Sequence, residues 1–491
     1  MKKIFILALA AALVGGAAYA NFCARDYVPA STLLVPYAVV ALGSDGTPDP
    51  SGYTTLVAVT NVSSEAQIIH LTVWNARSST VVDFDEVLTG YDVWTMNCRD
   101  LLNGRFDIFD TGVPSYGFWD DGTQTPGAKV LGPTPLPWGP TSNANGLTIN
   151  KPQDIDYPGF GFSSCQNPPY GNLSTLSSAI ISKIKSGIKA VPYGYVYCKS
   201  AVVGEPAWVA NLTTNPLFFY ITIDVTNACT TSFPNQSSYW SGHIPASKNV
   251  LIGDVIYTDT THNFSESIPA VSIESSPAAA TSGIQTFYGR YTGAAGVDDR
   301  EPLGTAFAFR YLNFGGVSTS IRVWKNRSEV FADDSTNGDP RYGKYLGLDT
   351  YIAYACDPFL YYAWDENENV RTRGGGPSGF STNEPNPLPF ETQDAPVNDA
   401  NFNGLVDTTT TAGTVTNGWM LLVMDPSVPN LSTVPYSTFP PLPQAWVGVK
   451  YNYGGFTTMN EAATMANAHC FPTQVLPNLG INYVYPVPVA Q

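Results

Sequence analysis

Oxygen-bearing side chains recur at alternate positions in one loop of the C-terminal half. The run places Asp399, Asn401 and Asn403 before Gly404, and Asp407 follows. Such oxygens, with a glycine for the tight bend, are how calcium loops surround a hard cation. The position of the final bidentate acid holds a threonine, however, and an Asn-Gly turn gives the same pattern. Calcium bound by Asp399, Asn401, Asn403 and Asp407 is therefore one expectation, and the sequence suggests no other cofactor.

Three carboxylates gather at the end of one predicted strand, in Trp364–Asn369. Asp365, Glu366 and Glu368 suit a cation or the paired acids of sugar hydrolysis, but glycosidase carboxylates must face each other across a cleft. Neighbouring residues do not provide that placement, and a solvated strand end has the same composition. The chain also lacks the G-x-S-x-G and H-E-x-x-H motifs. We therefore predict no catalytic residue and do not expect an enzyme.

Aromatic residues stand beside hydrogen-bonding groups in several turn-rich segments. Trp119, Trp138 and Trp240 are the best examples. A ring next to Asp, Asn or Ser is typical of sugar recognition, and the same residues suit a protein interface. Covering a small hydrophobic core is the third interpretation. The three tryptophans are the ligand-binding candidates of the sequence.

The seven cysteines are scattered singly along the chain. In an exported protein they indicate disulfides, and we expect Cys165 to pair with Cys198 and Cys356 with Cys470. Because the count is odd, at least one cysteine stays free or pairs between chains, and Cys23 is the candidate. No C-x-x-C motif is present.

The amino-terminal residues have the pattern of a secretory signal peptide. Lys2 and Lys3 precede an apolar stretch, Ile4–Val14, that is too short to cross a bilayer, and Ala18-Tyr19-Ala20 follows. We expect residues 1–20 to be removed during export across the inner membrane. No later stretch is long and apolar enough to span a membrane as a helix. The destination is the periplasm, the cell surface or the medium.

The chain is acidic and carries few charges. Its formal net charge is −16, and loss of Lys2 and Lys3 with the signal peptide makes it −18. Such a chain is repelled by nucleic acid and by anionic membranes. We therefore expect neither as a partner.

Apolar residues alternate with polar ones along many short segments. Every second residue of Leu217–Val225 is apolar, and Gln67–Trp74 shows the same period. This period indicates strands that bury one face, and turn dipeptides such as Asp45-Gly46 separate them. The predicted fold is mainly β, with one helix over Leu173–Ile188 and a shorter one over Asn460–Asn467.

A faint internal repeat supports a division of the chain into two halves. Leu71–Ser78 resembles Ile321–Ser328, since in both segments two residues separate a Val-Trp pair from an Arg-Ser pair. The strand phase puts the valines inward and the tryptophans on the opposite face. We infer two related β-sandwich halves of the immunoglobulin-like kind, with chance similarity as the alternative. The predicted boundaries are 21–274 for the N-terminal sandwich with an insertion at about 100–200, 275–283 for the linker, and 284–491 for the C-terminal sandwich.

Three phrases of the sequence, Leu33–Tyr37, Thr54–Val62 and Trp364–Glu368, resemble exported bacterial β proteins with no assigned role. The resemblance covers most of the mature chain. It implies the compartment and the fold class, and it supplies no catalytic or binding residue.

Three functions follow from these observations. The first is a secreted structural or interaction protein that works by assembly or contact, with other copies of itself or surface proteins as partners. The second is a carbohydrate-binding module or adhesin, with glycans as ligands. The third is a hydrolase that acts on polysaccharide.

Overall fold

The computed structural model describes the strand-rich parts of the chain, namely residues 25–26, 28–76, 78, 80–103, 160–163, 178–189, 215–227, 230, 232–242, 244–281, 286–292, 297–304, 306–326, 360–366, 370–373, 388, 390–397, 417–424, 444–453, 456–462 and 464–465. The described part is mainly β, as the alternation predicts. Within these residues, no helix is both long enough and apolar enough to cross a membrane.

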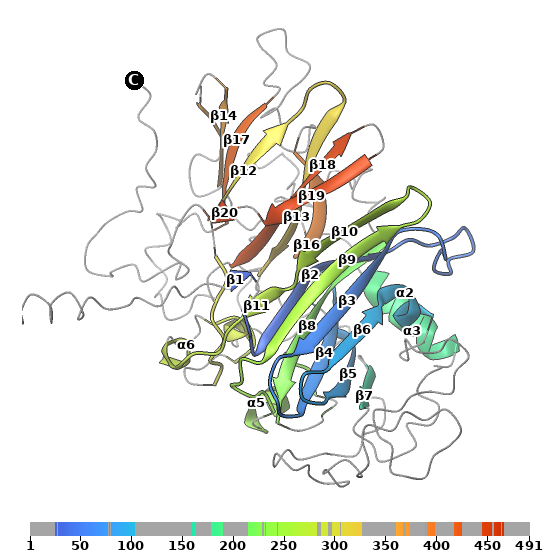
Figure 1. Cartoon of the computed structure of the whole chain (residues 1–491), viewed down its shortest axis with the longest axis vertical. Coiled ribbons are helices and arrows are strands. Elements are labelled where there is room, and N and C mark those ends of the chain that lie inside the picture. Colours follow the sequence, from blue (N-terminus) through green and yellow to red (C-terminus); the bar gives the residue numbers. More distant parts are fainter. Residues whose placement is uncertain are drawn as a thin grey trace, which may run out of the picture.

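An eleven-stranded sheet forms the part that we call the N-terminal block (Figure 1). Its strands are β1 (Arg25–Asp26), β2 (Thr32–Val40), β3 (Thr54–Asn61), β4 (Gln67–Asn75), β5 (Thr80–Leu88), β6 (Val93–Asn97), β7 (Phe160–Ser163), β8 (Leu217–Thr226), β9 (Leu251–Asp259), β10 (Phe264–Pro269) and β11 (Val271–Ile273).

This sheet folds over on itself at one corner. β2 joins β3 through the pair Val40–Thr54, whereas β3 pairs with β9 and β6 along most of its length. One wing therefore contains β2, β8, β4 and β5, and the other contains β10, β9, β3 and β6. The rings of Phe84 in β5 and Trp94 in β6 meet between the wings, 6.1 Å apart. Leu33, Ile223 and Leu71 lie side by side in the first wing and are fully buried.

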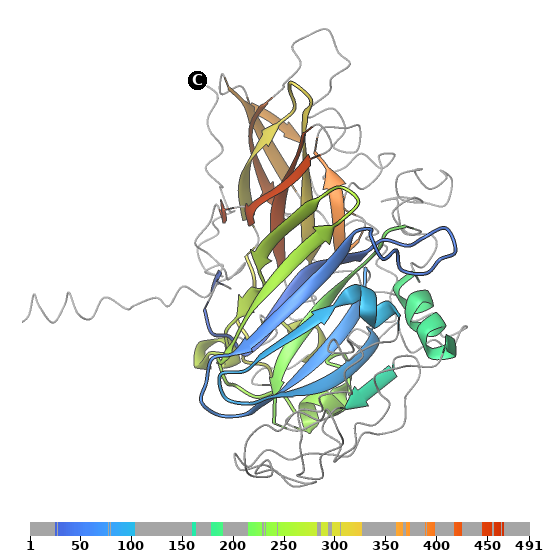
Figure 2. The ribbon, with the colours of Figure 1, turned by 45° about the vertical axis from the view of Figure 1, so that its right-hand side comes forward.

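Two smaller sheets form the C-terminal block. The five-stranded sheet has the order β15 (Val370–Arg373), β14 (Leu360–Asp365), β17 (Asn417–Val423), β12 (Ala306–Leu312) and β20 (Thr464–Met465), and the four-stranded sheet has the order β16 (Thr392–Pro396), β13 (Val317–Lys325), β18 (Ala445–Tyr453) and β19 (Phe456–Ala462). A second apolar core, with Phe309 from one sheet and Val323 from the other, lies between them. The two blocks follow each other along the long axis of the molecule (Figure 2).

Short helices complete the described structure: α2 (Cys98–Leu102), α3 (Ser178–Lys189), α5 (Ser237–Ser241), α6 (Pro277–Thr281) and α7 (Gly289–Thr292). α3 lies at the predicted helix, and its buried Ile184 and Ile188 are on its apolar stripe. The helix predicted over 460–467 is wrong, because β19 extends to Ala462 and β20 includes Thr464 and Met465. Here pairing with β18 overrides a helical pattern only two turns long.

Candidate functional site

One face of the β2-β8-β4-β5 wing carries polar side chains and is nevertheless buried. The alternation that directs Leu33, Ile223 and Leu71 into the core directs their neighbours to the opposite face. The polar side chains with no exposed surface on that face include Thr32, His70, Asp83, Asp85 and Asp224. Helix α5 and residues 286–292 and 297–303 cover it, so this polar face is buried inside the protein.

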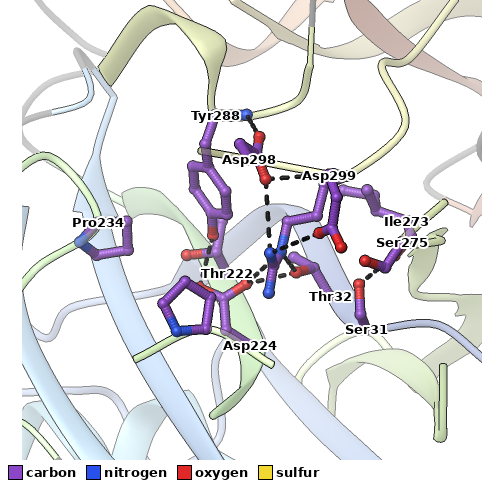
Figure 3. A network of polar contacts seen from close by, with 12 residues as sticks. Ser31, Thr32, Thr222, Asp224, Pro234, Ile273, Ser275, Tyr288, Asp298 and Asp299 are labelled. Atoms are coloured by element: carbon purple, nitrogen blue, oxygen red, sulfur yellow. Dashed lines mark hydrogen bonds and ion pairs between the residues drawn. The ribbon is translucent and has the colours of Figure 1, made fainter. Parts of the chain in front are cut away.

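Asp224 is the centre of the first cluster on this face (Figure 3). Its Oδ1 accepts a hydrogen bond from Thr32 Oγ1, and its Oδ2 accepts from Tyr239 at 2.8 Å and from Tyr288 at 3.0 Å. The Nε of Arg300 lies 3.5 Å from Oδ1 and donates to Thr32 Oγ1. We call these five residues the Asp224 cluster. They come from β2, β8, α5 and the segments 286–292 and 297–303, so the cluster connects the covering layer with the sheet.

Asp298 extends the cluster on the side away from Asp224 (Figure 3). Its Oδ1 lies 3.5 Å from Arg300 Nη1, and its Oδ2 accepts from the Tyr288 amide at 2.8 Å. Burial raises the pKa of Asp298, and Arg300 offsets part of that rise. Burial opposes the charge of Arg300, but Asp224 and Asp298 keep its pKa above the ordinary value. One guanidinium thus compensates two buried carboxylates.

The two phenols of the cluster act as fixed hydrogen-bond donors. Burial and then the neighbouring Asp224 carboxylate raise the pKa of Tyr239 and of Tyr288 well above the ordinary value. Both hydroxyl groups therefore stay protonated at neutral pH. Because every partner of Asp224 is itself buried, this arrangement stabilises the fold and presents no nucleophile or acid to a substrate.

His70 lies between two carboxylates in a neighbouring cluster. Its Nδ1 is 2.8 Å from Asp85 Oδ1, and its Nε2 is 3.6 Å from Asp83 Oδ2. Asp85 also accepts the Thr230 amide at 2.9 Å, and the imidazole packs on Tyr239. Among the described residues, no three His, Cys, Asp or Glu side chains are arranged to hold a metal ion. The His70 side chain is fully buried.

A third cluster joins the two blocks. Arg322 of β13 is 1% exposed, and its guanidinium lies over the rings of Tyr257, Tyr37 and Tyr53 at 4.1, 5.0 and 5.8 Å. Its Nε is 3.6 Å from Asp394 Oδ2 on β16. We call these residues the Arg322 cluster. Cation–π contacts are strongest when they are desolvated, so this cluster stabilises the packing of the C-terminal block on the N-terminal one.

An exposed aromatic residue with polar neighbours lies on the five-stranded sheet. Trp419 of β17 is 55% exposed and is the register partner of Arg310 on β12. Arg310 Nη2 donates to Glu366 Oε1 at 2.8 Å, and the Asn417 amide donates to the same oxygen at 2.8 Å. An indole thus lies in solvent beside a guanidinium, a carboxylate and an amide.

Most of the predicted site residues lie outside the described residues. This holds for the signal peptide at 1–20, for the calcium candidates, for two of the three tryptophans and for the disulfide candidates, namely Asp399, Asn401, Asn403, Asp407, Trp119, Trp138, Cys165, Cys198, Cys356 and Cys470. Trp240 is described and is 7% exposed, with its Nε1 donating to the Pro234 carbonyl at 2.7 Å. Its role in ligand binding stays a prediction. Cys98 is a free, buried thiol, and burial raises its pKa.

Comparison of the chain with protein-family models, with curated proteins and with solved structures gives no match. The resemblance to exported bacterial β proteins therefore stays a prediction. The charged residues at the centres of the clusters are not among the predicted site residues. Asp224 and Arg322 each lie on the polar phase of an alternating strand, so the pattern alone gives no sign that they are buried.

Proposed function

We propose that the chain is a secreted structural or interaction protein of the cell surface or extracellular space that works by assembly or contact. Its partners on this proposal are other copies of itself or surface proteins. The observation that carries the proposal is that the described buried charges pair with other groups of the same chain. These pairs connect strands with each other, the covering segments with the sheet, and one block with the other.

Such pairing favours one conformation of the two blocks. Removing one member of a buried charge cluster strongly lowers the stability of a fold. The described clusters connect residues that are far apart in sequence, such as Thr32 with Arg300 and Tyr257 with Arg322. A rigid body of this kind suits a protein that presents surfaces to partners. Large apolar side chains are available for contact on both blocks, namely Tyr91, Val93, Phe314, Trp419 and Tyr453.

Light scattering on the purified mature protein, combined with negative-stain imaging, tests the proposal. The measurement is made over a range of protein concentrations, once with calcium and once with a chelator. Defined oligomers, filaments or sheets are the expected result. A particle that stays monomeric under every condition, and that captures no surface protein from its own cell envelope, contradicts the proposal. A requirement for calcium would also support the 399–407 loop as a calcium site.

A carbohydrate-binding module or adhesin is the second candidate, and Trp419 favours it. Sugar rings stack on exposed indoles, while charged and amide groups next to the ring bind their hydroxyls. Arg310, Glu366 and Asn417 supply such groups beside Trp419. This site lies on the C-terminal block and not at the tryptophans that the sequence singles out.

A glycan array probed with wild type and with Trp419→Ala tests this second candidate. Tyr91→Ala is the matched control, because Tyr91 is 72% exposed on the N-terminal block. Binding that Trp419→Ala abolishes and Tyr91→Ala preserves supports carbohydrate recognition at this sheet. An array on which the wild type binds nothing counts against it.

A further inference from the structure

Lys450 and Asp394 meet on one face of the four-stranded sheet. They belong to β18 and β16, which flank β13, and their register partners on β13 are Ser320 and Arg322. Because Ser320 and Arg322 are two residues apart, all four residues lie on the same face. The small Ser320 side chain leaves room for Lys450 to reach across β13. Its Nζ contacts Asp394 Oδ2.

Little water reaches this contact. The Lys450 and Asp394 side chains are 16% and 18% exposed, and Arg322 beside them is 1% exposed. The tyrosine rings of the Arg322 cluster cover the guanidinium from the N-terminal block. Glu266 of β10 is near enough to act on the charge of Lys450. An amine, a carboxyl group and a second carboxylate therefore share a largely dehydrated junction.

Burial and ion pairing act in opposite directions on the charges of Lys450 and Asp394. Burial lowers the pKa of Lys450, and Asp394 offsets part of that shift. Burial opposes the charge of Asp394, but Lys450 and Arg322 together hold its pKa below the ordinary value. The resting pair is thus an ammonium carboxylate in which the ammonium is the less stable charge. Fixed contact between reacting groups supplies effective concentrations far above those of a bimolecular reaction.

We propose that Lys450 and Asp394 condense to an intramolecular amide bond that joins β18 to β16. The Nζ of Lys450 forms a bond to Cγ of Asp394, and one Cγ–O bond breaks. Two protons of the ammonium group leave with that oxygen as one molecule of water, and the third stays on the amide nitrogen. This condensation requires no oxidant, nucleotide or metal.

The contact itself supplies the first proton transfer. Nζ passes one proton directly to the Asp394 carboxylate that it contacts, which gives the amine and the carboxylic acid that react. Arg322, 3.6 Å from Oδ2, stabilises the negative oxygen of the tetrahedral intermediate. The product replaces two buried charges with a neutral amide, which removes their desolvation cost. The inference does not rest on the proposed function.

The intact mass of the reduced, denatured wild-type protein tests the proposal directly. We expect a mass lower by one water than that calculated for the chain from its measured N-terminus. Proteolysis should then give one branched peptide that links Lys450 to Asp394. A full mass, or a water loss that maps to any other residues, overturns the proposal.

Variants separate the roles within the junction. Lys450→Arg and Asp394→Ala should both have the full mass, whereas Lys248→Arg should keep the deficit, because Lys248 makes only a surface pair with Glu65. A complete deficit in Lys450→Arg overturns the assignment.

Discussion

Arg300 is the residue on which the charge balance of the Asp224 cluster depends. It is 1% exposed and faces two carboxylates that are themselves buried, Asp224 and Asp298. Arg300→Met keeps the length of the side chain but leaves both carboxylates without their cation. We expect the free energy of unfolding to fall by about 3–5 kcal/mol, as measured by urea denaturation at neutral pH.

Arg310→Met is the matched control for this substitution. Arg310 also pairs with a carboxylate, Glu366, but both side chains are about half exposed, at 48% and 50%. Surface pairs contribute at most about 1 kcal/mol, so this variant should unfold close to the wild type. Equal losses in the two variants would show that the burial of the Asp224 cluster has no energetic consequence.

The pH dependence of stability reports on Asp298. Burial raises its pKa in the folded state above the ordinary value of 3.8. The stability that this group contributes is therefore fully present below pH 3.8 and is lost as the pH rises through the raised value. We expect the difference in unfolding free energy, wild type minus Asp298→Asn, to decrease as the pH rises above 3.8. Urea titrations over a pH series measure it, and a difference that grows with pH contradicts the assignment.

The residues of these clusters were only partly predictable from the sequence. Asp224 and Arg322 are visible as charges within alternating strands, but alternation alone assigns them to a solvated face. Asp224 is covered by α5 and by residues 286–292 and 297–303. Arg322 is covered by three tyrosines that are remote from β13 in sequence, Tyr37, Tyr53 and Tyr257. No local pattern places Arg300 beside Thr32, because that contact exists only once the chain has folded.

Among the elements, β9 shows how closely the two wings of the N-terminal sheet approach. A Cβ atom on Gly253 would lie 2.9 Å from the Ala58 carbonyl oxygen and 2.9 Å from Leu33 Cδ1. We expect Gly253→Ala to destabilise the fold by about 1–3 kcal/mol, because neither the backbone nor the core can move away cheaply. Thermal denaturation measures the loss.

Ser265→Ala on the adjacent strand β10 is the control for the glycine substitution. Ser265 is exposed, so its replacement should change the unfolding free energy by less than about 0.5 kcal/mol. A Gly253→Ala variant as stable as this control would mean that the wings are not in contact at β9.

Strands and helices are predictable from the sequence where the periodicity of apolar residues continues over many positions. The alternation of Leu217–Val225 corresponds to β8, and the stripe in Leu173–Ile188 corresponds to the site of α3. The error at 460–467 has a physical cause. A segment of two helical turns has little stability of its own, and residues 456–462 pair with the edge of β18 instead. Whether β2 and β3 form one flat sheet or fold over at Val40–Thr54 depends on long-range packing.

At the scale of the whole molecule, the two Val-Trp pairs of the sequence repeat meet at the junction of the blocks. Val73 and Val323 point inward, as the strand phase predicts, Val73 into the first core and Val323 into the second. Trp74 and Trp324 both contact Tyr220, at 5.7 Å and 5.8 Å between ring centroids. Trp324 thus belongs to a C-terminal strand but packs in the N-terminal core, and this shared packing should make the blocks unfold together.

Trp324→Ala should separate the unfolding of the two blocks. The side chain is 1% exposed and also stacks on Phe287 at 5.4 Å, so its removal leaves a cavity at the junction and costs about 3–5 kcal/mol. Differential scanning calorimetry should give one cooperative transition for the wild type and two for the variant. Trp419→Ala, which removes an indole that is 55% exposed, should keep one transition at the wild-type temperature. If Trp324→Ala unfolds in one transition at the wild-type temperature, the aromatic contacts do not couple the blocks, and their cohesion must come from the Arg322 cluster.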